Sequence, residues 1–135
     1  MIAVDANVLL RYLLDDDIEQ SPRAARLFHR DDGILVTDVV LAETLWTLAG
    51  RKYRASRTDL AAVVDSLFRE PVVEFEDRQA VWGALGDFEA TAADFQDALL
   101  LHKARSVAER AQEPLSALYT FDVAALELDG AKRPV

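Results

Sequence analysis

The sequence predicts an α/β fold in which a mostly parallel sheet is covered by helices on both faces. Short apolar segments alternate along the chain with longer segments whose apolar residues recur at helical spacing. Two parallel strands need a long connection, and this connection is usually a helix. The 135 residues contain no repeat, no low-complexity segment and no linker, and one domain usually has about 100–150 residues. We therefore expect a single domain over residues 1–135.

Five short apolar segments are the expected strands. Asp5 ends the first of them, and the Asp32-Gly33 turn precedes the second. The segments are Met1–Val4, Ile34–Val36, Val72–Phe75, Leu115–Tyr119 and a short fifth one, Leu126–Leu128.

The expected helices begin and end at residues suited to those places. Ser21 can cap a helix, and Pro22 fits the first turn, where the missing N–H costs nothing. A glycine often follows the last turn. The helices are Asn7–Leu14, Ser21 to about Arg30, one capped by Thr37 or Asp38 and ended by Gly50, Asp59–Phe68 opened by Thr58 and stopped by Pro71, Arg78–Glu89, and about Ala93 to Arg110.

Composition excludes several classes of protein. Hydrophobic residues make up 51% of the chain, which is too much for a disordered chain. The absence of cysteine excludes disulfides, thiolate zinc sites and cysteine nucleophiles. No apolar run approaches the roughly 20 residues of a membrane span, and the first residues lack the pattern of a signal or transit peptide. We expect a cytoplasmic protein without a membrane partner.

Several acidic residues interrupt apolar surroundings and form the candidate site. Asp5 and Asp122 each follow an expected strand, Glu43 lies about two turns into a helix, and Asp94 and Asp97 lie near the start of the longest helix. Ligands of open parallel sheets bind at the carboxyl ends of the strands. Carboxylates gathered there cannot all stay ionised without a counter-charge. An oxygen-only donor set suits a hard divalent cation, Mg²⁺ or Mn²⁺.

Each acid also has an ordinary structural explanation. Asp5 can cap the helix that follows it, and Glu43 can be a solvated helix residue. Asp94 can be an acid favoured by a helix N-terminus, and Asp122 can be a turn residue. Asp97 is followed by apolar residues, so a solvated face explains it less well. The joint pattern is more specific than any one acid.

The other polar residues give less evidence for a function. Asp15-Asp16-Asp17 is expected to be a solvated loop, because consecutive side chains point in different directions. The two histidines, His29 and His102, are expected on helix surfaces, and a Ser-His-Asp triad has little support. No glycine-rich phosphate-binding motif is present, which argues against ATP- or NAD-dependent chemistry.

At the level of motifs, the chain resembles the PIN-domain ribonucleases. IAVDANVLLRYLL resembles the start of these proteins, LVTDVVLAETLWTL their second acidic motif, ADFQDALLLHKA the third and LYTFD the fourth. The resemblance covers Met1 to about Asp122, and the spacing and short length are most similar to VapC, the toxin of type II toxin–antitoxin modules. It implies a PIN-like three-layer sandwich with a mostly parallel sheet of about five strands flanked by helices.

The resemblance also implies a function and a set of site residues. The activity would be Mg²⁺- or Mn²⁺-dependent endoribonuclease cleavage of a specific cellular RNA, a tRNA or an rRNA. The partners would be this RNA and a VapB-like antitoxin, with a homodimer or a toxin–antitoxin hetero-oligomer as the assembly. Carried over residue by residue, the principal metal-site and catalytic acids are Asp5, Glu43 and Asp97, the fourth is Asp122, a possible further ligand is Asp94, and the supporting residues are Asn7 and Thr120.

Two surface features have expected roles. A basic stretch between two helices carries no acid and can contact RNA locally although the net charge is −9, since salt screens charges beyond about 10 Å; its alternative is a solvated helix end. Its basic residues are Arg51, Lys52, Arg54 and Arg57. An apolar groove for an antitoxin segment is the other feature, with core packing as its alternative, and its residues are Trp46, Tyr53, Leu60 and Phe68.

Two other functions compete with this interpretation. A haloacid-dehalogenase-like phosphotransfer domain also has an aspartate after the first strand, but it needs a second aspartate where this chain has Asn7. A non-catalytic PIN-like module that only binds RNA or protein would need no buried carboxylates, so the retained acids argue against it.

Overall fold

Three short parallel strands form the sheet in the N-terminal half of the chain. The computed structural model describes all residues, Met1–Val135, and the chain divides into two compact units, Met1–Glu76 and Asp77–Val135. In the first unit, β1 (Ile2–Ala3) pairs with β2 (Ile34–Val36), and β2 pairs with β3 (Val73–Phe75). Both pairs are parallel, as the alternation of apolar and amphipathic segments predicts.

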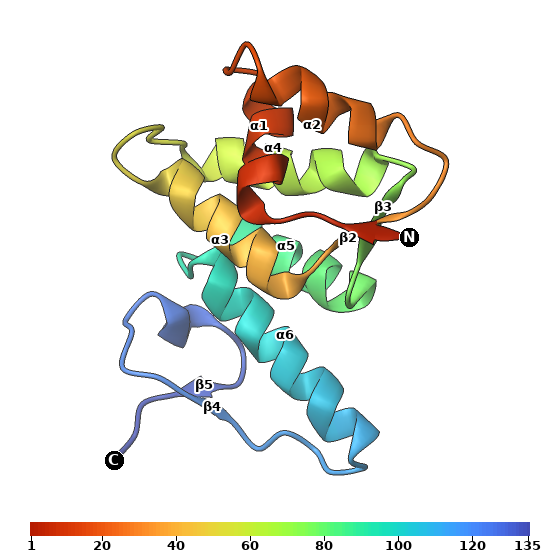
Figure 1. The fold of residues 1–135 in the computed structure, drawn as a ribbon. Helices are drawn as coiled ribbons and strands as arrows, with labels where there is room; N and C mark the ends of the chain where they lie inside the picture. Colours follow the sequence, from red (N-terminus) through yellow and green to blue (C-terminus); the bar gives the residue numbers. More distant parts are fainter. The chain divides into compact units, whose positions relative to one another are not determined.

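Two helices connect each strand of this sheet to the next (Figure 1). The helices α1 (Ala6–Leu14) and α2 (Gln20–Phe28) lie between β1 and β2, and α3 (Asp38–Ala49) and α4 (Arg57–Arg69) lie between β2 and β3. The expected positions of all four helices are confirmed within a few residues.

Four helix starts, those of α1, α3, α4 and α5 (Arg78–Ala90), have a side-chain cap, and the starts of α4 and α2 differ from the expected ones. The helix α4 begins at Arg57 because its cap is Ser56 rather than Thr58. The Ser56 hydroxyl accepts the Asp59 N–H, and the Asp59 carboxylate accepts the Ser56 N–H in return. Ser21 does not cap α2. Its buried hydroxyl instead accepts the Asp17 N–H, inside a helix that begins at Gln20.

The core of the first unit lies between the sheet and its helices. The central strand β2 is buried at Ile34 and Val36, as expected for a strand with a neighbour on each side. The rings of Tyr12 and Phe28 stack at 3.8 Å between their centroids and join α1 to α2. The ring of Phe68 packs on that of Phe75 at 4.6 Å, which joins α4 to β3.

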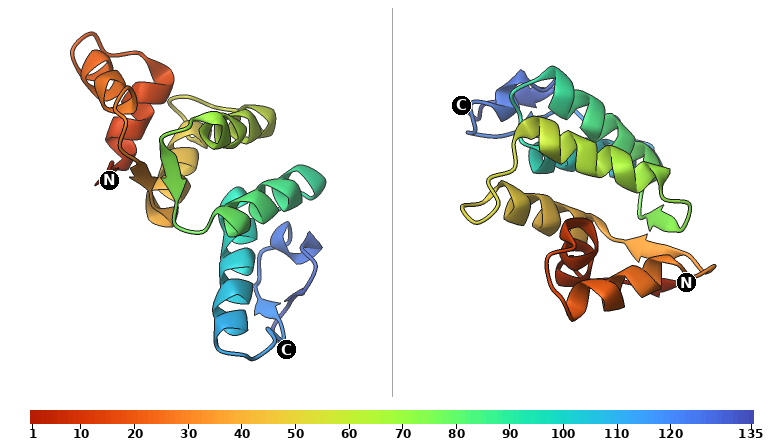
Figure 2. Two further views of the ribbon diagram at one scale, coloured as in Figure 1. Left: turned by 90° about the vertical axis from the view of Figure 1, so that its right-hand side faces the viewer. Right: turned by 90° about the horizontal axis from the view of Figure 1, so that it is seen from above.

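The second unit is a helical pair followed by a short parallel strand pair (Figure 2). Its elements are α5 (Arg78–Ala90), α6 (Phe95–Arg110), β4 (Leu118–Tyr119), the 3₁₀ helix η1 (Ala125–Glu127) and β5 (Ala131–Lys132). The helices approach closely at Gly83, where a Cβ atom would overlap the imidazole ring of His102. The strand segment is tied to α6 by Arg105, whose guanidinium donates to the carbonyl of Asp129 at 2.6 Å.

The expected α/β fold with about five parallel strands is confirmed, and the strands are divided into a three-stranded sheet and a separate pair. Two expectations for the second unit are wrong. Leu126–Leu128 is not a strand, because η1 forms there and the fifth strand is β5. His102 is not a surface residue: it is partly buried, and its Nε2 lies 2.7 Å from Oδ2 of Asp87. None of the helices has the length and apolarity needed to cross a membrane.

Candidate functional site

Asp5 and Thr37 lie at equivalent positions on the carboxyl edge of the three-stranded sheet. Ala3 of β1 pairs with Leu35 of β2, and Asp5 and Thr37 each follow their member of this pair by two residues. Each caps the next helix, because Asp5 Oδ1 accepts the Val8 N–H at 2.9 Å and Thr37 Oγ1 accepts the Val40 N–H at 3.3 Å. The helices α1 and α3 therefore both begin at the carboxyl edge of the sheet, after the neighbouring parallel strands β1 and β2.

Asp5 is an exposed helix cap in the structure. Capping uses Oδ1 only, and the other carboxylate oxygen accepts no hydrogen bond within the protein. A cap and a cation ligand are therefore compatible functions of this side chain, since one oxygen is held by α1 and the other faces solvent.

Glu43 and Asn7 are both exposed. Glu43 lies in the middle of α3, whose other side is buried at Leu41, Thr44 and Leu45. Asn7 lies in the first turn of α1, two residues after Asp5, and lines a groove with Val8 and Arg11. The amide of Asn7 forms no hydrogen bond with a carboxylate in this structure.

Glu76 is an acid at the sheet edge that the sequence analysis missed. It follows β3 directly, and its Oε1 accepts the Asp38 N–H at 3.0 Å. This bond adds a negative charge at the N-terminus of α3, where the helix dipole favours it. The signal that could have revealed it is the one used for Asp5, an acid directly after an apolar strand.

In the second unit, two acids act electrostatically on a third, Asp97. Asp94 is the N-cap residue of α6, Asp97 lies in the first turn of that helix, and Asp122 follows β4. Burial raises the pKa of the Asp97 carboxyl, and the negative charges of Asp122 and Asp94 raise it further. The fold therefore brings Asp122 close enough to act on Asp97.

The raised pKa of Asp97 runs against its place in the helix. A carboxylate in the first turn is normally stabilised by the helix dipole, which lowers its pKa. Burial and two neighbouring carboxylates outweigh that effect here. A cation beside Asp97 would remove the repulsion and favour the ionised form.

These donors suit a hard cation, but the structure shows no complete coordination site. All the candidate side chains are carboxylates, and neither histidine accompanies them, which fits Mg²⁺ or Mn²⁺ better than zinc. In neither unit do three acidic or histidine side chains gather closely enough to hold a metal ion.

Thr120 shapes the turn that carries Asp122. The Asp122 N–H donates to Thr120 Oγ1 at 3.0 Å, and Asp122 Oδ1 accepts the Ala125 N–H at 2.9 Å. Thr120 and Asp122 thus fix the backbone between β4 and η1, and Asp122 combines a turn-forming role with its effect on Asp97.

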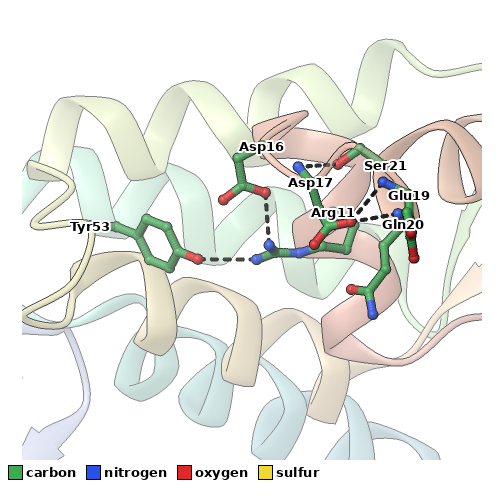
Figure 3. A network of polar contacts seen from close by, with 7 residues as sticks. All are labelled: Arg11, Asp16, Asp17, Glu19, Gln20, Ser21 and Tyr53. Carbon is green, nitrogen blue, oxygen red and sulfur yellow. Dashed lines mark hydrogen bonds and ion pairs between the residues drawn. The ribbon is translucent and has the colours of Figure 1, made fainter.

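The Asp15–Asp17 loop is not merely solvated, which corrects the expectation. Figure 3 shows Arg11 between Asp16 and Tyr53. Its Nη1 lies 2.8 Å from Asp16 Oδ1, and its Nη2 donates to the Tyr53 hydroxyl at 3.0 Å. Asp17 accepts the N–H groups at the start of α2, which lowers the pKa of its carboxyl. The Arg11 guanidinium lowers the pKa of Tyr53.

The basic stretch between α3 and α4 is exposed, as a surface for RNA requires. Arg51, Lys52 and Arg54 lie in the loop, and Arg57 is the first residue of α4. The Lys52 ammonium lies 5.2 Å from the centre of the Tyr53 ring. The Tyr53 hydroxyl in turn accepts a hydrogen bond from Arg11, which connects this loop to α1.

The expected apolar groove is only partly present. Trp46 is 72% exposed, whereas Leu60 is buried in the core, so Leu60 was wrongly assigned to a surface. Phe68 is partly buried against Phe75. Tyr53 is partly buried, and its hydroxyl is bound to Arg11.

Comparisons with known proteins agree with the motifs. The PIN domain family matches residues 2–129, which extend through both units and include all the candidate acids. No curated protein matches the chain. The chain is similar to the solved structure of Mycobacterium tuberculosis VapC20, which is described as a toxin that cleaves the sarcin-ricin loop. The sequence identity is 19% and the TM-score 0.43, and the alignment covers 99% of this chain and 100% of that one. On the family match, the chain belongs to the PIN domain family.

Proposed function

We propose that the chain is a metal-dependent endoribonuclease of the VapC type, which hydrolyses a phosphodiester bond in a specific cellular tRNA or rRNA. The observation that carries this proposal is the PIN domain match over residues 2–129. Within that range the four acidic motifs occur in the order typical of these ribonucleases.

The acids that would hold Mg²⁺ or Mn²⁺ are Asp5, Glu43, Asp97 and Asp122, with Asp94 as a possible further ligand. Bound there, the ion supplies Lewis-acid chemistry for phosphodiester hydrolysis. The protein orients the side chains that would hold the ion. Asp5 is oriented by the Val8 N–H, and the Thr120 turn positions Asp122. The neighbouring charges that disfavour ionisation of Asp97 favour a cation beside it.

No histidine is needed as a base in this mechanism. His102 is bound to Asp87, and His29 is the exposed C-cap residue of α2. We further propose that the basic residues Arg51, Lys52, Arg54 and Arg57 contact the RNA backbone, since arginine binds phosphate oxygens through two parallel N–H groups.

The assembly and location follow from the same proposal. Residues 1–135 would act as one PIN domain in the cytoplasm, inhibited by a VapB-like antitoxin and assembled as a homodimer or a toxin–antitoxin hetero-oligomer. Exposed apolar side chains on α3, Val39 and Trp46, support a protein partner.

One observation favours a second candidate, a non-catalytic PIN-like module that binds RNA or protein. Asp5 and Asp122 both accept backbone N–H groups, and this structural role would retain them without catalysis. Asn7, in the place of a second aspartate, argues against a haloacid-dehalogenase-like phosphotransferase.

The decisive experiment compares Asp97→Asn with the wild-type protein. Purified proteins are incubated with total cellular RNA in Mg²⁺ or Mn²⁺ and in EDTA, and the new RNA ends are mapped. Asp65→Asn is the matched control, because Asp65 forms only an exposed ion pair with Arg69 on α4. We expect discrete cleavage by the wild type and the control, and none by Asp97→Asn or in EDTA. Full cleavage by a folded Asp97→Asn protein would refute the mechanism, and wild-type protein that binds Mn²⁺ without cutting any RNA would favour the non-catalytic module.

A further inference from the structure

Four of the nine residues that line a groove between α1 and α2 are arginines. Its volume is about 670 Å³, and all its lining residues belong to the first unit. The two helices that form it lie side by side (Figures 1 and 2). The arginines are Arg11, Arg23, Arg26 and Arg30.

Two of these arginines have no acidic partner. Arg23 and Arg26 form no ion pair or side-chain hydrogen bond in the structure, and α2 contains no acidic residue. Arg23 and Arg26 are three residues apart on α2, so their side chains leave the same face of the helix, and Arg30 lies two residues beyond its end. This face presents a row of positive charge.

The other two arginines have partners outside the groove. Arg11 is held by Asp16 and Tyr53 (Figure 3), and its buried Nε makes no hydrogen bond. Arg30 pairs with Asp32 at 2.7 Å. Since no acidic residue lines the groove, its surface is positive although the whole chain has a net charge of −9.

One end of the groove adjoins Asp5. Asn7 and Val8 line the groove, and the Val8 N–H donates to Asp5 Oδ1 at 2.9 Å. A chain lying along the arginine row would therefore reach the carboxyl edge of the sheet.

We propose that this groove binds the phosphate backbone of the RNA strand and leads it to Asp5; this inference rests on the proposed ribonuclease function. Guanidinium groups match phosphate oxygens with two parallel N–H donors. Arg23 and Arg26 can donate hydrogen bonds to a phosphate without first losing an ion pair. Salt screens the distant acidic surface beyond about 10 Å, so the local positive row decides contact. An acidic polypeptide would match the charge, but it gives no reason for the groove to end at Asp5.

The test is RNA binding by the double variant Arg23→Ala/Arg26→Ala. Both it and its parent carry Asp97→Asn and are measured in EDTA, so that the RNA stays intact. The probe is a fluorescent single-stranded oligoribonucleotide of mixed sequence, and its anisotropy is followed over a range of salt concentrations. The matched control is Arg69→Ala/Arg133→Ala, which removes two exposed arginines outside the groove.

We expect the groove variant to bind RNA about tenfold more weakly at 0.1 M salt, and the control to bind like the parent. Each phosphate contact on a single strand contributes about 0.7 to the slope of log K against log salt. Loss of two contacts should therefore reduce the slope by about 1.4. Circular dichroism of each variant confirms that the fold is retained.

Unchanged affinity and an unchanged slope in the folded groove variant would overturn the proposal. It would also be overturned if the variant lost binding to polyglutamate while keeping its binding to RNA, because the groove would then serve an acidic protein. Absence of Mg²⁺-dependent cleavage by the wild type is a separate outcome: it refutes the ribonuclease function, whereas the binding measurement alone decides the role of the groove.

Discussion

Tyr12 donates its phenolic hydrogen to Oε1 of Glu70 at 2.6 Å, joining the first helix of the N-terminal unit to the end of its fourth. Burial and the Glu70 carboxylate raise the pKa of Tyr12 to about 12. Tyr53, which accepts a hydrogen bond from Arg11, has its pKa lowered from the ordinary value of 10.0 by that guanidinium. Two tyrosines of the same unit are thus shifted in opposite directions.

The first prediction is that Tyr53 ionises before Tyr12 as the pH rises. In a pH titration followed by the ultraviolet absorbance of phenolate, Tyr53→Phe should lack the transition at the lower pH, and Tyr12→Phe should lack the transition at the higher pH. Because the folded pKa of Tyr12 lies above its unfolded value, its contribution to stability is present below about pH 10 and is lost as the pH rises towards 12. Ionisation in the reverse order would contradict the two hydrogen bonds.

The second prediction concerns the two glycines of α5. Gly83→Ala should destabilise the protein by about 1–3 kcal/mol, because the new methyl group overlaps the His102 ring and displaces it from Asp87. Gly86→Ala is the matched control. No atom lies within 4 Å of a Cβ there, so the substitution should stabilise the helix by about 0.5–1 kcal/mol. Urea unfolding measures both, and equal effects of the two substitutions would show that Gly83 is not a contact site.

The positions of helices and strands could be predicted from the sequence because local patterns determine them. The β2 segment is apolar throughout, and α3 follows a threonine that can cap it. The fifth strand could not be placed, because the alternation of Leu126 and Leu128 with Glu127 resembles a half-buried strand, whereas the Asp122 side chain accepts the Ala125 N–H and the segment forms a 3₁₀ turn. Likewise, Ser56 was overlooked as a cap, because Thr58 is equally suited by type, and only the reciprocal bond with Asp59 decides between them.

The candidate acids stay a prediction from their apolar neighbours in the sequence, and the hydrogen bonds around them could not be predicted. Nothing local indicates that Tyr53 reaches Arg11, or that Glu76 accepts the Asp38 N–H. The arginine groove was also missed. Its charges come from α1, α2 and the residue beyond α2, so they become one feature only when the helices pack together.

The third prediction concerns Asp77, which caps α5 by accepting the Ala80 N–H at 3.0 Å. This bond lowers the pKa of the Asp77 carboxyl, with smaller contributions from Ser106, Lys103 and Arg110. A lowered folded pKa means that the stabilisation is present above the unfolded value of 3.8 and is lost as the pH falls through the folded value. Asp77→Ala should cost about 1 kcal/mol at pH 7 and little in strong acid. Thermal unfolding across this pH range tests it, and an equal loss at both extremes would exclude a role for the carboxylate charge.

The fourth prediction concerns the electrostatic link between Asp122 and Asp97. Asp122→Asn removes one of the negative charges that raise the pKa of Asp97, while the asparagine oxygen can still accept the Ala125 N–H. The pKa of Asp97, followed by carbon-detected NMR of its carboxyl group, should therefore fall but stay above its ordinary value, because burial and Asp94 still act on it. Asp129→Asn is the control, since Asp129 is an exposed acid of the same unit that does not contribute to the shift. An unchanged pKa in Asp122→Asn would place the two carboxylates too far apart to share a cation, whereas a fall would show that each is within electrostatic reach of the other, as a shared Mg²⁺ ion requires.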